Sequence, residues 1–220
     1  MNLLKDYFLQ KEANNWFNRN LKTISNKNFY DDLYSKEIIS FLKKNNFKSQ
    51  KLLDIGAANG MRLKFISEKV SRKNIKFFGV EPSNKAIKFN VNSKIILKKG
   101  TADELPFKDE TFDAVAFSFC LYLCDDELLP KIVFETLRVL KKNSNIFIFD
   151  FYNKNKIYKN YKHFPKINIR KMDNSKIFTC FPNIKKIKEK IVPYNLFYNF
   201  QYHNIYQSED KLAIHVLKKK

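Results

Sequence analysis

The fold of this chain is decided by one stretch, Leu53-Asp54-Ile55-Gly56-Ala57-Ala58-Asn59-Gly60. The apolar run that ends at Ile55 predicts a strand, and apolar residues at helical spacing follow the second glycine. A glycine turn between a strand and a helix lets the backbone approach a ligand closely, and the amino end of the helix favours negative charge. The stretch therefore predicts a ligand site at the end of the first strand of a parallel sheet.

Strand and helix patterns alternate after this point. Apolar runs predict strands at 51–55, 77–81, 95–97, 112–117 and 146–149, with helices at 63–70, 84–89 and 126–140 between them. The strands are apolar on both faces, which is typical of a parallel sheet covered by helices. Two more runs, 184–192 and 211–217, predict an antiparallel pair, connected through 208–210. The predicted fold is α/β: a Rossmann-like, doubly wound, mostly parallel seven-stranded sheet with helices on both faces and an antiparallel C-terminal strand pair.

We expect one domain over residues 1–220. Residues 1–46 predict an N-terminal helical cap, 51–151 the ligand-binding core, and 152–220 a substrate-side loop with the C-terminal strand pair. Within that last part, residues 155–170 are polar and aromatic without a clear period, so we expect a loop with a short helix.

Two acids accompany the glycine turn. Asp54 precedes the first glycine, a position that suits a ligand with an amino group as well as a carboxylate. Glu81 ends the second strand, 21 positions after Gly60, where a carboxylate can accept hydrogen bonds from both ribose hydroxyls. Each feature alone also fits a structural turn or a solvated strand end, but together they indicate an adenosine-containing ligand. The Gly-x-x-x-Gly spacing departs from the Gly-x-Gly-x-x-Gly of nicotinamide-binding enzymes and disfavours that class.

Further segments carry a family resemblance. They are Gly100-Thr101-Ala102-Asp103-Glu104-Leu105-Pro106-Phe107, Phe112-Asp113-Ala114-Val115 and Glu135-Thr136-Leu137-Arg138-Val139-Leu140-Lys141. With the glycine turn and Glu81, they closely resemble class I S-adenosylmethionine (SAM) dependent methyltransferases over about 52–151. The resemblance makes residues 51–151 a SAM-binding core and the whole chain a single methyltransferase domain.

The resemblance also implies roles for cofactor-binding residues. Gly56, Ala57, Ala58, Asn59 and Gly60 would cradle the methionine part of SAM, with Asp54 near its ammonium group. Glu81 would hold the ribose, with Pro82 beside it. Thr101, Ala102 and Asp103 would border the adenine, and Ser118 and Phe119 would lie close to the sulfonium.

The chain departs from the family pattern at two of these positions. Many relatives have glycine where Ala58 stands, and we expect Ala58 to cost little if its backbone stays in an ordinary region. Many have aspartate where Thr101 stands, which leaves backbone groups and Asp103 to meet the adenine amino group.

Three other segments resemble a bacterial subgroup of these enzymes that is associated with surface-polysaccharide or small-metabolite pathways. They are Trp16-Phe17-Asn18-Arg19-Asn20, Cys120-Leu121-Tyr122-Leu123-Cys124-Asp125 and Lys171-Met172-Asp173-Asn174-Ser175-Lys176. The acceptor is therefore expected to be a small molecule, such as a sugar or another anionic metabolite.

Candidates for the acceptor side follow the fourth and fifth strands. An oxygen acceptor needs a general base, and His163 is the candidate because it follows the fifth strand. Tyr122 and Tyr152 could shape the acceptor pocket or simply pack, and Arg19 could reach the carboxylate of SAM. Trp16 is expected to be an apolar lid or core residue, and His215, on the last strand, a structural one.

The positive charge of the chain leaves alternative functions open. The formal net charge is +20, with +12 in residues 151–220 and +8 in residues 1–150. Only five of the 42 basic residues are arginine, which supplies most forked contacts to bases. Two rival hypotheses therefore remain. The protein could be an RNA methyltransferase that uses its basic C-terminal region, or a non-catalytic polyanion-binding protein on the same fold. The run 118–121, Ser-Phe-Cys-Leu, argues against amino-group methylation of the Asn/Asp-Pro-Pro-aromatic type.

We expect the three cysteines, Cys120, Cys124 and Cys180, to be small buried apolar residues of a protein in a reducing compartment. Two of them lack a nearby histidine, so we expect no metal site. The longest apolar run, Val115 to Cys124, is about half the length needed to span a bilayer. We expect a cytoplasmic protein without a membrane span, and the sequence makes no prediction of its oligomeric state.

Overall fold

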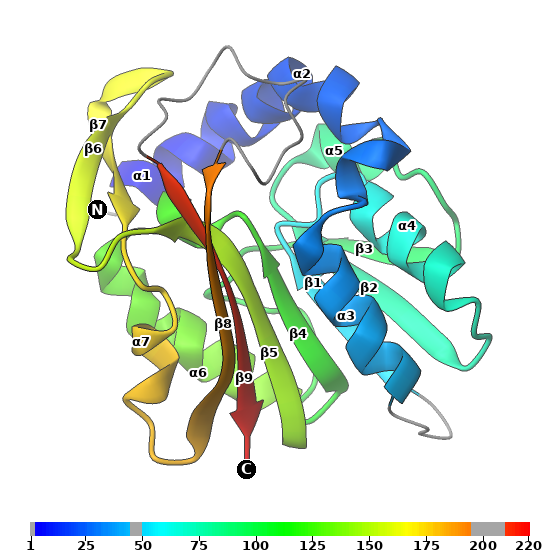
Figure 1. Cartoon of the computed structure of the whole chain (residues 1–220). Coiled ribbons are helices and arrows are strands. Elements are labelled where there is room, and N and C mark those ends of the chain that lie inside the picture. Colours follow the sequence, from blue (N-terminus) through cyan, green and yellow to red (C-terminus); the bar gives the residue numbers. More distant parts are fainter. Residues whose placement is uncertain (1–2, 45–49, 195–209) are drawn as a thin grey trace.

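A seven-stranded sheet crosses the computed structural model, which describes residues 3–44, 50–194 and 210–220 (Figure 1). The strand order is β3-β2-β1-β4-β5-β9-β8. The first five strands are parallel, whereas β9 is antiparallel to β5 and to β8. Their bounds are β1 Gln50–Ile55, β2 Ile75–Glu81, β3 Ile95–Lys99, β4 Phe112–Ser118, β5 Leu140–Tyr152, β8 Ile184–Pro193 and β9 Lys211–Lys219. The predicted doubly wound sheet with its antiparallel pair is confirmed.

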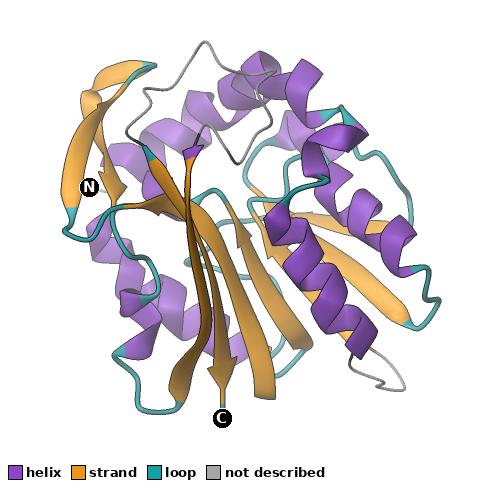
Figure 2. Ribbon diagram, in the orientation of Figure 1, coloured by secondary structure: helices purple, strands orange, loops and turns teal. Residues whose placement is uncertain are grey.

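Helices cover both faces of this sheet (Figure 2). Ala114 and Ala116 of β4 belong to the apolar cluster that includes α3 (Leu33–Lys44) and α4 (Met61–Val70). Val115 and Phe117 alternate with them and pack against α6 (Leu129–Val139) and α7 (Lys176–Thr179). Because side chains alternate between faces along a strand, β4 is apolar at four successive positions, 114–117, where both faces are covered. The short helix α5 (Asn84–Lys88) completes the set between β2 and β3.

The N-terminal cap lies across the carboxyl ends of the parallel strands (Figure 1). It consists of α1 (Leu3–Tyr7), a π-helical turn at Phe8–Glu12 and α2 (Ala13–Ile24). A 3-10 turn at Lys27–Tyr30 leads into α3. Residues 45–46 of the predicted cap, and 208–209 of the predicted connection, lie outside the described residues.

The prediction for residues 155–170 was wrong. They form a two-stranded hairpin, β6 (Ile157–Tyr161) and β7 (Phe164–Lys171), in place of a loop with a short helix. The hairpin packs on the N-terminal cap, where the rings of Tyr7 and Phe164 stack with centroids 4.3 Å apart. Its buried isoleucines, Ile167 and Ile169, belong to the core cluster that also contains residues of the cap and of the sheet. Because these partners are distant in sequence, the local pattern is too weak to indicate a strand pair.

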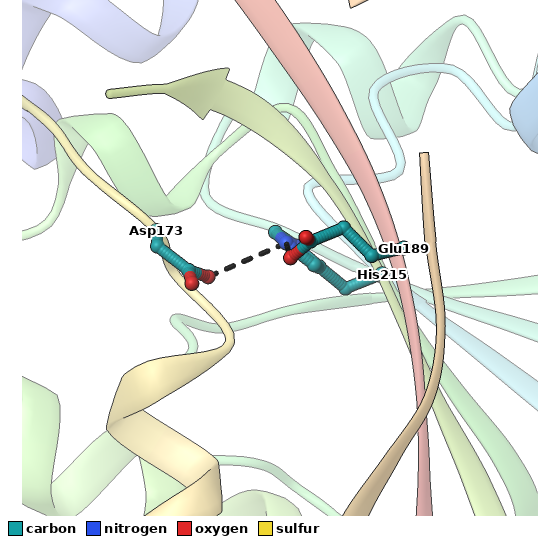
Figure 3. A group of neighbouring side chains, drawn as sticks. All are labelled: Asp173, Glu189 and His215. Atoms are coloured by element: carbon teal, nitrogen blue, oxygen red, sulfur yellow. Dashed lines mark hydrogen bonds and ion pairs between the residues drawn. The ribbon is translucent and has the colours of Figure 1, made fainter. Parts of the chain in front are cut away.

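A charged cluster ties the segment before α7 to the antiparallel strands (Figure 3). His215 of β9 is buried, and its Nε2 lies 3.0 Å from Oε2 of Glu189 on β8 and 3.3 Å from Oδ1 of Asp173. Lys186 completes the cluster with its ammonium 2.5 Å from the Glu189 carboxylate. Burial lowers the pKa of His215 despite the two carboxylates. His215 thus has packing and polar contacts within the sheet, as expected of a structural residue.

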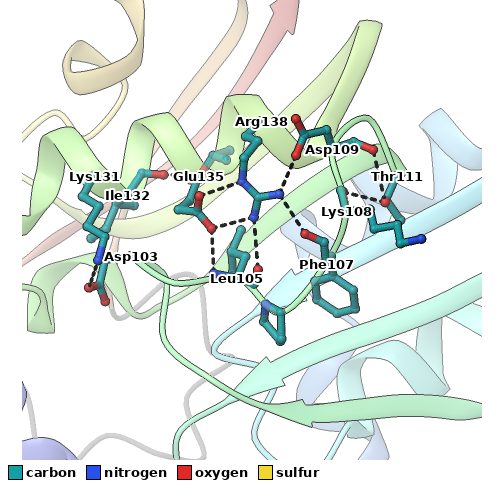
Figure 4. Close-up of polar contacts among 12 residues, drawn as sticks. Asp103, Leu105, Phe107, Lys108, Asp109, Thr111, Lys131, Ile132, Glu135 and Arg138 are labelled. Carbon is teal, nitrogen blue, oxygen red and sulfur yellow. Dashed lines mark hydrogen bonds and ion pairs between the residues drawn. The ribbon is translucent and has the colours of Figure 1, made fainter.

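An arginine fixes the loop that follows β3 (Figure 4). Arg138 of α6 donates to the carbonyl oxygens of Leu105 (3.1 Å) and Phe107 (2.8 Å). It also forms ion pairs with Glu135 (2.7 Å) and Asp109 (2.8 Å). Glu135 accepts a hydrogen bond from the amide of Leu105 at 2.9 Å. The segment that begins at Gly100 is therefore attached to α6 rather than only to its own strand.

The condition set for Ala58, an ordinary backbone region, is not met. Its φ is +48°, in the left-handed region that glycine adopts without a steric penalty. Gly56 and Gly60 are left-handed too, with φ values of +79° and +78°. The turn between β1 and α4 thus has three left-handed residues in five positions, and Ala58 has the Cβ that this conformation disfavours.

We predict that Ala58→Gly raises the free energy of unfolding by about 0.5–1 kcal/mol, because it removes the left-handed strain. Ala57, whose φ is negative, supplies the matched control, and Ala57→Gly should destabilise by roughly the same amount through backbone entropy. Urea denaturation of both variants measures the difference. A loss of stability in Ala58→Gly equal to that in Ala57→Gly would contradict the strain.

Candidate functional site

A pocket opens where the strand order reverses, at the carboxyl ends of β1, β2 and β4. It encloses about 860 Å³, including its open mouth. Doubly wound sheets bind ligands at such a reversal because the loops after adjacent strands diverge there. Eight of the predicted cofactor-binding residues line it: Gly56, Glu81, Pro82, Thr101, Ala102, Asp103, Ser118 and Phe119.

The other five predicted cofactor-binding residues lie behind this lining. Asp54, Ala57, Ala58 and Asn59 are buried, and none of them or Gly60 is a lining residue. Asn59 supports the turn, because its Oδ1 accepts a hydrogen bond from the amide of Met61 at 3.3 Å. The Ala58 amide donates to the Glu81 carboxylate at 2.9 Å, so this turn also supports a residue that lines the pocket.

Gly56 brings the two loops of the floor together. A Cβ built on Gly56 would lie 2.9 Å from Cβ of Cys120, closer than real Cβ contacts allow. The Gly56 amide donates to the carbonyl of Val80 at 3.0 Å, which joins this turn to the end of β2 as well. The close approach needs a residue without a side chain; the sequence had suggested this need toward a ligand, whereas the structure shows it toward Cys120.

Two buried carboxyls lie at this floor, and neither has an ion-pair partner within 4.0 Å among the described residues. Asp54 accepts a hydrogen bond from the Ser118 hydroxyl at 2.5 Å. Burial raises the pKa of Asp54 to about 6, although that hydrogen bond and the charge of Arg62 act in the opposite direction. The Asp54 contact also fixes the start of the loop after β4.

Glu81 is the second carboxyl, and it lines the pocket. Its oxygens accept hydrogen bonds from the amides of Ala58 and Ser83, both at 2.9 Å. Burial raises the pKa of Glu81 to about 7, and the two amides only partly offset this. A carboxyl near neutrality, held at a strand end and facing a cavity, is a candidate ligand contact.

The N-terminal cap supplies the outer side of the pocket. Phe8, Leu9 and Trp16 line it, and Lys5 closes one end by pairing with Asp103 at 2.6 Å. The backbone amide of Lys5 also donates to Asp125 at 3.0 Å. Trp16 was expected as a lid or core residue, and its half-buried side chain lies in the pocket wall.

Arg19 has other partners than a ligand. It forms an ion pair with the buried carboxylate of Glu12 and lies 3.4 Å from the Tyr161 hydroxyl. That hydroxyl donates to Glu12 at 2.5 Å. The Arg19 side chain therefore joins α2 to the hairpin, and the idea that it reaches the carboxylate of SAM loses its support.

The three acceptor-side candidates lie outside the lining of the pocket. His163 is exposed in the hairpin turn, with its ring 5.4 Å from that of Tyr161. Tyr122 is buried and packs on Phe119, whose ring lies in the pocket wall. Tyr152 ends β5, 6.4 Å from the ring of His215. Their roles toward an acceptor stay predictions.

Several lining residues were missed by the sequence analysis. They come from the cap (Lys5, Phe8, Leu9, Ala13), from the segment after β4 (Cys120, Leu123, Cys124, Asp125) and from the approach to α6 (Leu128, Ile132). The expectation of buried cysteines was also wrong: Cys120 and Cys124 are half-buried pocket residues and Cys180 is exposed. The amphipathic pattern identified the apolar side of the cap but could not indicate which surface it covers.

One group outside the pocket has ligand types that metals take. The candidate ligand atoms of Asp173, Glu189 and His215 lie within 4.8 Å of one another (Figure 3). Asp173 and Glu189 come from different parts of the chain, so their spacing gave no signal. Lys186 already supplies a cation to both carboxylates, at 2.5 and 3.7 Å. In the described part of the chain, this cluster therefore has a partner for each carboxylate without a metal.

No helix among the described residues is long and apolar enough to cross a bilayer. Comparison with known proteins bears on the core. Residues 52–143 match a family model described as a methyltransferase domain. A search of the curated proteins finds no match for the chain.

Solved structures share the fold. A Burkholderia thailandensis 1,6-didemethyltoxoflavin-N1-methyltransferase, crystallised with its substrate and S-adenosylhomocysteine, has a TM-score of 0.68 at 12% identity, covering 99% of this chain and 87% of that one. A SAM-dependent methyltransferase from Methanosarcina mazei has 0.60 at 14%, covering 81% and 96%. A chain of the Haloferax volcanii complex with the methyltransferase activator Trm112 has 0.66 at 12%, covering 94% and 96%. These solved structures share the Rossmann-like fold of this chain, and the family model matches its core.

Proposed function

We propose that this chain transfers a methyl group from SAM to a small-molecule acceptor. The observation that carries the proposal is Glu81, a buried carboxyl that lines the pocket beside the glycine turn. Such a group suits the two hydroxyls of a ribose. The methyltransferase match over residues 52–143 supports the reaction, and the neighbour crystallised with S-adenosylhomocysteine supports the cofactor.

The residues of the pocket fit the parts of SAM. Gly56 lines the pocket with its backbone, and Glu81 would hold the ribose. Thr101 and Ala102 would border the adenine mainly through their backbone, because Lys5 already occupies the Asp103 carboxylate. Asp54, behind the lining, would favour the ammonium group of SAM through its charge.

The chemistry asks this protein mainly for orientation and the exclusion of water. SAM supplies a methyl group on a sulfonium, which becomes a neutral thioether when the acceptor atom takes that methyl group. Ser118 and Phe119 would fix the reacting end of the pocket, where Phe119 has a left-handed backbone with φ +61°. Orientation can contribute up to roughly 7–11 kcal/mol in favourable cases. His163 remains our candidate base for an oxygen acceptor, and Tyr122 and Tyr152 our candidates for acceptor contacts.

Two further expectations stay proposals. The resemblance to a bacterial subgroup supports an acceptor from a surface-polysaccharide or small-metabolite pathway. Three free cysteines support a reducing, cytoplasmic location.

The basic surface is the feature that favours the two alternatives, an RNA methyltransferase or a polyanion-binding protein, and both can be tested. Lys185, Lys188 and Lys190 are exposed on the edge strand β8 and do not line the pocket. Binding of RNA through several phosphates should weaken steeply with added salt, whereas SAM binding in the pocket should barely change. Titration of SAM and of a mixed-sequence RNA at low and high salt separates the two. Tight, salt-resistant RNA binding would contradict the small-molecule proposal.

We predict that Glu81→Gln weakens SAM binding by about 10–100-fold, since a hydrogen bond to a charged group contributes roughly 1.5–3 kcal/mol. Calorimetry with SAM, S-adenosylhomocysteine and NADH measures this, and NADH should not bind. Glu104→Gln is the matched control, because Glu104 is an exposed acid outside the pocket lining. Equal SAM affinity in wild type and Glu81→Gln would remove the main support for the assignment.

The affinity for SAM should also depend on pH. The pKa of Glu81 is about 7 in the free protein because the group is buried. Ribose hydroxyls and a nearby sulfonium favour the ionised carboxylate, so binding should lower this pKa and release a proton. Affinity should therefore rise between about pH 6 and 8. Calorimetry in buffers of different ionisation enthalpy measures the released proton, which should disappear in Glu81→Gln; proton uptake would contradict the sign.

A further inference from the structure

The pocket and the surface of this protein differ in charge. The chain has a formal net charge of +20, yet the ionisable acids and bases that line the pocket are one lysine and three acids: Lys5, Glu81, Asp103 and Asp125. The lining is therefore acidic in a strongly basic protein. An anionic acceptor would be attracted to the surface and repelled at the pocket itself.

The single basic lining residue is not available to a ligand anion. The Lys5 ammonium pairs with Asp103 at 2.6 Å, and the Asp103 side chain is only 3% exposed. Lys131, near the same carboxylate at 3.7 Å, is directed to it as well. Lys5 therefore neutralises an acid of the wall and leaves no cation among the described lining residues for a phosphate or carboxylate.

The side of the pocket that the cofactor residues do not account for is apolar. We define it as the outer wall: Phe8, Leu9 and Trp16 of the cap, and Leu123 after β4. Phe8 and Trp16 are half-buried, and Leu9 is 42% exposed although it lines the pocket. An exposed leucine beside two aromatic rings at a pocket mouth favours an apolar, ring-containing molecule.

We infer that the acceptor presents an uncharged, largely apolar ring to the outer wall, and that it has no phosphate or carboxylate at the pocket. The inference rests on the proposed function, because it names the class of acceptor for that site. It differs from the sequence-based expectation of an anionic metabolite. That expectation was based on the net positive charge of the chain. Among the described residues, the basic side chains that give this charge lie outside the pocket lining, apart from Lys5.

The inference is tested in two stages that separate it from the proposed function. Trp16 is the single tryptophan of the chain and lies in the pocket wall, so its fluorescence reports binding there. In the first stage, S-adenosylhomocysteine should change this fluorescence saturably. No binding in this stage would overturn the proposed function and, with it, the acceptor class.

The second stage uses protein saturated with S-adenosylhomocysteine. Equilibrium dialysis compares three probes that share one ring system: 2-naphthol, 2-naphthyl phosphate and 2-naphthylmethylamine. We expect 2-naphthol to bind about tenfold or more tightly than the phosphate, because a buried phosphate without a paired cation is costly. If the phosphate or the amine binds as tightly as 2-naphthol, or if no probe binds, the inference is overturned while the proposed function stands.

Two variants test whether the naphthyl probes bind at the outer wall. Leu9→Lys puts a cation on the outer wall and should reduce or reverse the preference for 2-naphthol over the phosphate. Phe134→Lys is the matched control, because Phe134 is a 64% exposed apolar residue on α6 that does not line the pocket. An equal change in both variants would show a general charge effect and would overturn the assignment to the outer wall.

Discussion

The close approach of the loops after β1 and β4 is the constraint on which the site depends. Gly56 lies against Cys120 with no room for a Cβ, and its amide bonds to the end of β2. This contact sets the floor of the pocket at the point where the strand order reverses. Asp54 adds a hydrogen bond to Ser118 across the same gap, so backbone and side chains fix the two loops together. The left-handed backbone at Ala58 and Phe119 lies in these same loops, and the surrounding packing maintains it.

The helix α3 is held to the sheet and to α4 by buried polar contacts as well as by apolar packing. The Tyr34 hydroxyl of α3 donates to the carbonyl of Phe117 at 3.0 Å, and Arg62 of α4 forms a buried ion pair with Asp32 at 2.7 Å. The ring of Tyr34 also lies 5.1 Å from the Arg62 guanidinium. Buried polar groups need such partners because the low dielectric makes an unpaired one costly. The segment from Asp32 into α3 is therefore fixed relative to the carboxyl end of β4 and to α4.

The surface and the pocket of this protein differ in charge, and the net charge of the chain does not show this difference. Lysines dominate the surface, including the edge strand β8, where charged side chains discourage pairing with another chain. Three acids and one paired lysine line the pocket. Burial raises the pKa of the two buried carboxyls at its floor, Asp54 and Glu81. A surface charge affects solubility and long-range attraction, whereas recognition depends on the groups that a ligand touches.

Sequence alone determined the sheet, because strands that carry apolar residues on both faces have to be covered on both sides. It also determined the glycine turn and Glu81, since a strand end and its following turn are local features. Tertiary structure decided the rest. The hairpin β6–β7 gains its partners from the cap and the sheet, and Lys5 and Asp103, which are 98 residues apart, meet only after folding. The outer wall, the strain at Ala58 and the cluster around His215 likewise arise from segments distant in sequence. Local periodicity reports which side of a segment is apolar, but not which surface that side will cover, and the chemistry of a pocket depends on that second fact.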